Sequence, residues 1–253
     1  MAAIETCLKK AAGGDFGDFS EQQLVDCGYQ QNGANGCNGA PTYSYIQYIA
    51  DTSLELTHES TYPYLNTAPL LTCPTTEPYN TGAKIVGNYY SYSGDEDKLK
   101  ALVAEHGAVV TGVAAAGPFS NYGGGIFSGC TSSEQDHAVT VVGYGTSDGE
   151  DYWLIKNSWG SDWGEGGFIR LKRGVGMCGI GEALAVPLCE AVDGATSAPL
   201  TTSAEPCVDK YTSCPEYAEY NCYSYGEHCA KVRKKTRSKF AKYFFRAVVC
   251  VTA

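Results

Sequence analysis

The sequence predicts an α+β fold in which a helical region is followed by a mainly antiparallel β region. Up to about residue 82, apolar residues recur with helical spacing between Gly- and Asn-rich turns. From Ala83 onward, short β-branched or aromatic runs alternate with Gly and Asp turns. The length of 253 residues and the apolar content of 43% are sufficient for a folded core.

The helical region opens with a segment from Met1 to about Lys10 that has the pattern of one face of a helix. Ser20 followed by Gln23 is typical of a capping box, and it predicts a helix that ends near Cys27. Gly and Asn residues then mark turns before the next helical pattern.

The β region contains strand-like runs and one helix. The runs are KIVGNYYSYS, AVVTGVAAAG, DHAVTVVGYG, DYWLIKNSWG and GFIRLKR, and each is bounded by turn residues. The helix is expected near Asp95 to His106. Helices followed by a predominantly antiparallel sheet define the α+β class.

Charge is distributed unevenly along the chain. Residues 1–206 carry 9 Lys and Arg against 24 Asp and Glu, whereas residues 207–253 carry 9 against 4. The acidic body argues against nucleic acid as a partner, because phosphate binding requires a basic surface.

The chain contains twelve cysteines and no C-x-x-C pair. Structural zinc sites show short, paired ligand spacings, so this pattern favours disulfides over a metal site. Disulfides indicate an oxidising compartment, extracellular or lysosomal, although no secretory signal is recognisable at the start of this sequence. No cofactor is expected.

His137 and Asn157 are the candidate catalytic pair. His137 begins one apolar strand and Asn157 ends the next, and the turn GTSDGED between them lets both side chains lie side by side. The amide oxygen of Asn157 would accept a hydrogen bond from one ring nitrogen and leave the other facing a reactant. Trp159 is placed to cover this hydrogen bond and exclude water.

At these residues the sequence resembles the papain-like cysteine peptidases, a family that catalyses through Cys-His-Asn. The resemblance runs from about Met1 to Leu188 and rests on ordered motifs: SEQQLVDC, NGCNGA, YPY, GGIFSGC, DHAV, GYG, KNSWG, WGEGGF and CGIG. It implies a papain-like two-lobe fold, with a helical lobe over about residues 1–82, a β-barrel-like lobe over about 83–188 and a substrate cleft between them. The implied activity is that of a cathepsin L-like cysteine endopeptidase.

The resemblance also implies roles for single residues. His137 corresponds to the general base and Asn157 to the residue that orients it. Ala183, a small residue at the floor of the specificity pocket, implies an apolar P2 side chain such as Leu or Phe. The substrate-binding positions implied in this way are Gly39, Ala40, Gly112, Asp136, Ala138, Trp159 and Ala183.

The family's nucleophile motif, C-G-[SA]-C-[WY], does not occur in this sequence. Because AAIET matches later turns of the helix that carries the motif, the resemblance places the nucleophile roughly six residues before Met1. Cys7 would then lie about twelve residues further along that helix, roughly 18 Å from its N-terminus. The helix dipole and imidazolium that lower a thiol pKa act at that terminus, so we expect Cys7 to be an ordinary helix cysteine.

The resemblance implies a set of disulfides. By resemblance, Cys27 pairs with Cys73, and Cys130 pairs with Cys178. Cys37 would pair with a cysteine just before the nucleophile, so an odd thiol is expected at this position.

The C-terminal part resembles a separate small module. Residues 189–206 have the composition of a linker, and residues 207–236 resemble the start of an ShK toxin-like domain. Residues 237–253 are expected to form a basic amphipathic or disordered tail, the one part that could contact a membrane surface. The residues that carry the ShK resemblance are Cys207, Asp209, Cys214, Cys222 and Cys229. The last two cysteines of that pattern fall at Arg233 and Thr236, so the module is degenerate and only Cys214–Cys229 can pair.

Three functional classes remain open. The first, which we favour, is a monomeric endopeptidase that acts on polypeptides or binds peptidase inhibitors and takes its nucleophile from upstream of Met1. The second is an inactive pseudo-peptidase that binds peptides or inhibitors, and this best describes residues 1–253 by themselves. The third is a binding protein that acts through its basic, cysteine-rich tail.

Overall fold

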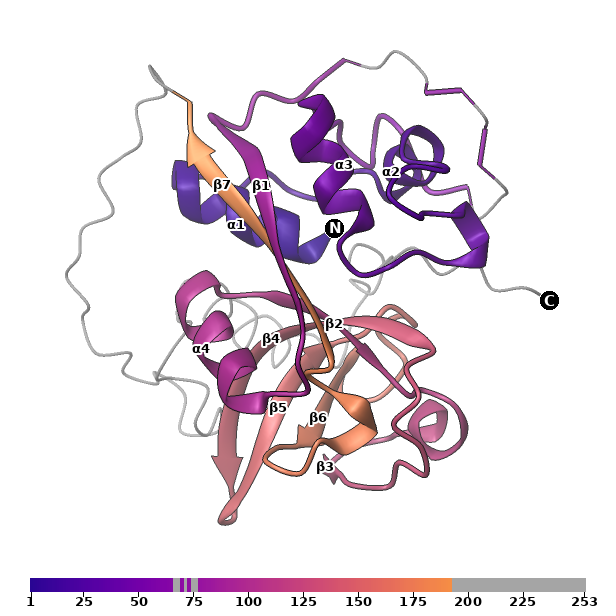
Figure 1. The fold of residues 1–253 in the computed structure, drawn as a ribbon, viewed down its shortest axis with the longest axis vertical. Coiled ribbons are helices and arrows are strands. Elements are labelled where there is room, and N and C mark those ends of the chain that lie inside the picture. The colour runs from indigo at the N-terminus through magenta and orange to yellow at the C-terminus, as the bar shows by residue number, and fades with distance from the viewer. Residues whose placement is uncertain (66–68, 71, 74–76, 193–253) are drawn as a thin grey trace, which may run out of the picture.

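The computed structural model describes residues 1–65, 69–70, 72–73 and 77–192, which form a group of helices beside a large sheet (Figure 1). The helices precede most of the strands along the chain, so the predicted α+β class is confirmed. Among the described residues, none of the helices has the length and apolar character needed to cross a membrane.

The helical group forms from short elements with local start signals. The hydroxyl of Ser20 accepts a hydrogen bond from the N–H of Gln23 at 3.0 Å, which is the first half of the predicted capping box. The second half does not form, because the Gln23 side chain instead donates to the carbonyl of Glu55 and accepts from the N–H of Thr57. The elements are α1 (Ala2–Ala12), α2 (Glu21–Cys27), the 3-10 turn η1 (Gly36–Asn38) and α3 (Ser44–Thr52).

The β region forms one seven-stranded sheet with the strand order β1-β7-β2-β4-β5-β6-β3. Neighbouring strands are antiparallel except for β3 and β6, which are parallel. The strands are β1 (Ala83–Tyr92), β2 (Val109–Val113), β3 (Ile126–Phe127), β4 (His137–Ser147), β5 (Glu150–Lys156), β6 (Phe168–Lys172) and β7 (Ala183–Ala191). The remaining elements are α4 (Glu96–His106), η2 (Gly117–Asn121) and η3 (Met177–Gly179).

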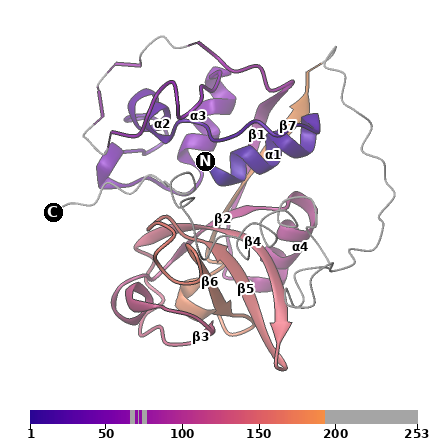
Figure 2. The ribbon, with the colours of Figure 1, turned by 180° about the vertical axis from the view of Figure 1, so that it is seen from behind.

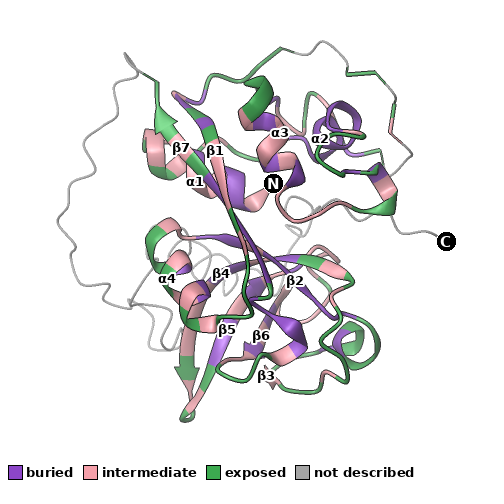
Figure 3. Cartoon of the chain, viewed as in Figure 1, coloured by how far each residue is buried: buried purple, intermediate pink, exposed green. Residues whose placement is uncertain are grey.

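Two hydrophobic cores hold the molecule together (Figure 3). One lies inside the β region and contains the fully buried side chains of Trp153 and Phe119. The other lies between the helices and the outer strands, and it includes Ile4 of α1 and Ala185 of β7. Strands β1 and β7 extend beyond the rest of the sheet and pack against α1 and α3, as both views show (Figures 1 and 2). These two strands therefore connect the helical group to the sheet.

Disulfides reinforce both parts of the fold. Cys27–Cys73 and Cys130–Cys178 are disulfide-bonded, and these are the two pairs that the family resemblance implied. Cys37 is also disulfide-bonded, so the odd thiol expected there is wrong.

Another disulfide joins Cys7 of α1 to Cys189 of β7. The prediction that Cys7 is an ordinary helix cysteine is therefore wrong. The physical cause of this disulfide is the packing of α1 against β7, which brings the two Cα atoms to 5.8 Å, within the usual span of a disulfide. Because β7 continues to Ala191, the strand also extends past the linker boundary expected at residue 188.

The C-terminal expectations fall outside the described residues. They concern the rest of the linker up to residue 206, the ShK-like module of residues 207–236 with its Cys214–Cys229 pair, and the tail of residues 237–253. All of them stay predictions from the sequence.

Candidate active site

His137 and Asn157 lie side by side at one end of the sheet. His137 is the first residue of β4, and Asn157 directly follows the last residue of β5, which pairs antiparallel with β4. His137 Nε2 and Asn157 Oδ1 are 2.8 Å apart. The structure therefore brings together the two residues that the sequence singled out for catalysis.

The hydrogen bonds of Asn157 determine which nitrogen of His137 carries the proton. The same Oδ1 atom accepts a second hydrogen bond, at 2.8 Å, from the backbone N–H of Ser158. A backbone N–H can only donate, so this end of the amide is the oxygen, and His137 Nε2 must be the donor. In the neutral ring, Nδ1 is then the atom that can accept a proton.

An aromatic cluster covers this pair. The Trp159 ring stacks on the His137 ring with 4.9 Å between centroids and an interplanar angle of 27°. Phe119 and Trp163 each pack edge-to-face against Trp159, with centroids 5.8 Å and 5.2 Å away. Since Asn157 is only 3% exposed, the hydrogen bond lies in a low-dielectric environment that strengthens it and fixes the orientation of the imidazole.

The surroundings keep the imidazole uncharged. Burial lowers the pKa of His137 below its ordinary value of 6.5, and this effect exceeds two opposing ones. The hydrogen bond to Asn157 and the negative charge of Asp136 both raise the pKa. At neutral pH the side chain is therefore a neutral base, which is the protonation state that can accept a proton.

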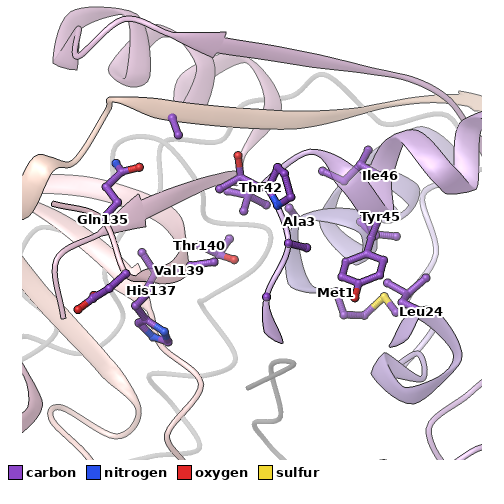
Figure 4. Close-up of a pocket in the computed structure, with 18 of the residues that line it drawn as sticks. Met1, Ala3, Leu24, Thr42, Tyr45, Ile46, Gln135, His137, Val139 and Thr140 are labelled. Atoms are coloured by element: carbon purple, nitrogen blue, oxygen red, sulfur yellow. The ribbon is translucent and has the colours of Figure 1, made fainter. Parts of the chain in front are cut away.

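A cavity of about 730 Å³ separates His137 from the N-terminal end of α1 (Figure 4). One wall, the β wall, is built by the start of β4 together with residues of β1, β2 and β7, and it includes Val139 and Thr140. The other wall, the helical wall, includes Met1, Leu24 and Ile46. The positions expected from the sequence that line the cavity are Gly39, Ala40, Asp136, His137, Ala138 and Ala183.

Gly39 and Ala40 offer accessible backbone at the edge of the cavity. Gly39 has φ 97° and ψ 176°, a conformation that favours glycine, and a Cβ atom there would meet nothing within 4 Å. Its carbonyl accepts a hydrogen bond from the N–H of Asn35, which fixes the loop. The conformation requires glycine at position 39, and the open space leaves the segment available for an extended peptide.

Asp136 and Trp159 both help to position His137. The N–H of Asp136 donates to the carbonyl of Val113, and its Oδ1 accepts from the N–H of Ala115 at 2.7 Å. Asp136 therefore ties the start of β4 to the chain after β2 and positions His137. Trp159 does not line the cavity; it lies against the His137 ring.

Gly112 was expected to be a substrate-binding position, but its place in the structure differs. It does not line the cavity, because the side chain of Gln135 lies over it and takes its place in the lining. Gln135 was not predicted as a lining residue, although it directly precedes Asp136 and His137 in the sequence. Nothing in the pattern of the sequence shows that its side chain folds back onto β2.

Cys7 has no contact with this cavity. It lines a separate cavity of about 340 Å³ together with Lys10 and Cys189. Within the part of the chain that the structure describes, no group of three or more His, Cys, Asp or Glu side chains is arranged to hold a metal ion.

An imidazole held by an amide, rather than by a carboxylate, is the arrangement found in Cys-His-Asn thiol hydrolases, and this defines the class of protein. Residues 1–188 match the family model described as papain family cysteine protease, and the chain belongs to this family.

Individual relatives agree with this assignment. The chain is 42% identical over 173 residues to a cathepsin L-like proteinase of Fasciola hepatica, an alignment that covers 67% of this chain and 51% of the relative. It is 34% identical over 242 residues to the probable cysteine protease RD21B of Arabidopsis thaliana, covering 90% of this chain and 50% of the relative. The chain spans about half the length of these relatives.

Among solved structures, the bromelain protease of Ananas comosus in complex with the E64 inhibitor superimposes with a TM-score of 0.66 and 32% identity. The match covers 74% of this chain and 85% of that one. Procathepsin L 3 from the larval midgut of Tenebrio molitor gives the same TM-score with 36% identity, covering 74% of this chain and 60% of that one. The overall fold is therefore papain-like.

Proposed function

We propose that this chain forms the substrate cleft and the general-base half of a cathepsin L-like cysteine endopeptidase. The observation that carries the proposal is the 2.8 Å hydrogen bond between His137 and Asn157, beneath Trp159 and beside a large cavity. This arrangement gives a neutral imidazole with a defined tautomer and an apolar cover, which are the requirements for general-base catalysis.

In the proposed reaction neutral His137 takes the thiol proton of the cysteine at Nδ1, and the resulting thiolate attacks the carbonyl carbon of a peptide bond. Protonated His137 then gives this proton to the leaving amine, which leaves an acyl-enzyme. The acyl-enzyme is then hydrolysed by a water molecule. His137 Nδ1 takes one proton from that water and returns it to the thiolate as the acid product leaves. Asn157 holds the ring in place through both steps.

The thiolate would come from the position that the family resemblance places roughly six residues before Met1. In support, Met1, which caps α1, and Ala3 of α1 line the same cavity as His137, so the N-terminal end of this helix faces the base (Figure 4). Residues 1–253 by themselves would then be inactive. Cys7 cannot replace the nucleophile, because its sulfur is in a disulfide.

The proposed substrates are polypeptides, and peptidase inhibitors would bind in the same cleft. Ala183 is 8% exposed at the cavity surface, which suits an apolar P2 side chain such as Leu or Phe. Bromelain, a structural relative, was solved with the inhibitor E64. By family, the protein would work as a monomer in an extracellular or lysosomal compartment, and residues 207–236 would form its ShK-like module.

The test compares residues 1–253 alone with the same chain fused behind a segment that carries the family's nucleophile motif. We expect the fused protein to hydrolyse a fluorogenic peptide with Phe at P2, and the unfused chain to have no activity. The matched control is the fused protein in which the supplied cysteine is replaced by alanine; it should be inactive although folded. Hydrolysis by the unfused chain, labelling of Cys7 by an epoxide peptide, or a folded but inactive fused protein would contradict the proposal.

The same experiment separates the alternatives that the sequence left open. A pseudo-peptidase would bind peptides in the cleft but gain no activity from the supplied nucleophile. A protein that acts through its C-terminal tail would bind no peptide in the cleft, and its binding to anionic vesicles would disappear when residues 207–253 are removed.

A further inference from the structure

Gln135 lines the cavity two residues before His137 in the chain, and its amide is fixed by two hydrogen bonds. Nε2 donates to the carbonyl of Gly112 at 3.0 Å and to the carbonyl of Gly179 at 2.7 Å. Backbone carbonyls can only accept, so this end of the amide must be the nitrogen. The position of the oxygen, Oε1, is therefore also determined.

Gly112 makes this arrangement possible. A Cβ atom at position 112 would collide with the amide carbon and oxygen of Gln135, so only glycine lets the side chain lie directly over β2. Gly112 is not among the glycines with positive φ, so the backbone conformation does not require glycine there. Glycine is therefore needed at position 112 for steric reasons, because the Gln135 side chain occupies the volume that a Cβ atom would fill.

The oxygen of Gln135 is available to a ligand. Within the described part of the chain no donor reaches Oε1, and Gln135 is one of the residues that line the cavity. In Figure 4 the oxygen end of the amide is the end turned toward the helical wall. The cavity surface therefore carries a fixed, neutral hydrogen-bond acceptor next to His137.

The surroundings of this acceptor suit an aromatic side chain. Ala138 and Ala183 line the same cavity. Tyr92 of β1 lines it too and pairs directly with Ala183 of β7, so both side chains lie on one face of the sheet. A charged side chain would lose hydration against this apolar surface, whereas a phenol ring packs on it and keeps its hydroxyl for the acceptor.

We propose that Gln135 is a specificity-determining residue, and that its Oε1 accepts a hydrogen bond from a tyrosine hydroxyl of the substrate in the pocket beside His137. The pocket that Ala183 also lines still accepts an apolar side chain such as Leu or Phe, but the cleft prefers tyrosine to phenylalanine there, because a site that offers a hydrogen bond discriminates against the analogue that lacks it. This inference rests on the proposed function and names its substrate class.

The test uses residues 1–253 and two peptides that differ by one hydroxyl, N-acetyl-Tyr-Ala-amide and N-acetyl-Phe-Ala-amide. Isothermal titration calorimetry gives both dissociation constants. We expect the Tyr peptide to bind about threefold to tenfold more tightly, the range of one neutral hydrogen bond. The preference should disappear in Gln135→Met, which keeps the length of the side chain but removes the acceptor.

Two further variants complete the design. Gly112→Ala should also remove the preference, because the new methyl group displaces the Gln135 amide without removing it. Gln47→Met makes the same chemical change on α3, outside the cavity lining, and should keep the preference.

The possible results are distinct. Equal affinity for the two peptides in the unsubstituted chain overturns the role of Gln135 and leaves the peptide cleft intact. A preference for Tyr that survives in both Gln135→Met and Gly112→Ala also overturns it. If neither peptide binds, the proposed function itself fails, and the role of Gln135 fails with it.

Discussion

The two walls of the cavity are built on different principles. On the β wall, hydrogen bonds fix the base: Asn157 Oδ1 accepts from both His137 and Ser158, and Asp136 holds the chain in front of His137, although Asn157 Nδ2 is buried without a partner among the described residues. On the helical wall, side chains such as Met1 and Ile46 are apolar. The β wall therefore orients the imidazole proposed as the base, and the helical wall contributes apolar surface.

Tyr45 shows the contrast within one functional group. It lines the helical wall, and its hydroxyl is buried with no hydrogen-bond partner among the described residues. Burial raises the pKa of Tyr45 to about 12, with smaller effects from Asp26 and Tyr64. Asn157 also has an unpartnered buried atom, Nδ2, but its Oδ1 orients His137, whereas the unpartnered Tyr45 hydroxyl lowers stability and makes no hydrogen bond among the described residues.

The largest effect is expected from the base itself. In the fused protein that carries a nucleophile, His137→Ala should lower kcat/KM by about 1,000-fold or more, because no other group takes the proton. The matched control is His58→Ala, since His58 stacks on Phe19 and does not line the cavity. Similar losses in the two variants would show that His137 has no special role.

The next effect concerns the disulfide that joins the two sides of the molecule. Replacing Cys7 and Cys189 with serine should lower the free energy of unfolding by about 2–5 kcal/mol, measured by urea denaturation. The matched control removes Cys27–Cys73, which closes a sequence separation of 46 residues instead of 182. On chain entropy, the Cys7–Cys189 pair should cost about 1 kcal/mol more. An equal or smaller loss would contradict the prediction that the longer loop closed by Cys7–Cys189 contributes more to stability.

The smallest effect is expected on the helical wall. Tyr45→Phe should raise the free energy of unfolding by about 1 kcal/mol, because it removes a buried hydroxyl that has no partner within the described structure. The same change at Tyr62, whose hydroxyl donates to Asp26, should lower the free energy of unfolding. Equal losses of stability in the two variants, measured by thermal or urea unfolding, would contradict the prediction. They would show that the Tyr45 hydroxyl makes a stabilising hydrogen bond.

The features that could be predicted from the sequence depend on residues close together in the chain. The base pair follows from local pattern, since His137 and Asn157 sit at the ends of two strands joined by one turn. The cap of α4 is equally local: the Asp95 side chain accepts from the N–H groups of Asp97 and Lys98. Features of this kind depend on neighbours in the chain, so periodicity and turn residues reveal them.

The features that were missed depend on contacts between distant parts of the chain. The Cys7–Cys189 bond forms only because α1 packs on the last strand, across a separation of 182 residues. Gln135 covers Gly112 because β2 and β4 are neighbours and a glycine leaves space between them. Neither juxtaposition has a signal in composition, spacing or periodicity.

The protonation state of His137 in residues 1–253 can be measured by ¹⁵N NMR of the imidazole across a pH titration. We expect neutral His137 to carry its proton on Nε2 and to have a pKa below 6.5, because burial outweighs its favourable contacts. Asn157→Ala should lower this pKa further, since the hydrogen bond from Nε2–H to Asn157 stabilises the protonated ring. A proton on Nδ1 in the neutral ring, or a pKa that rises in Asn157→Ala, would contradict the assignment of His137 as a base oriented by Asn157.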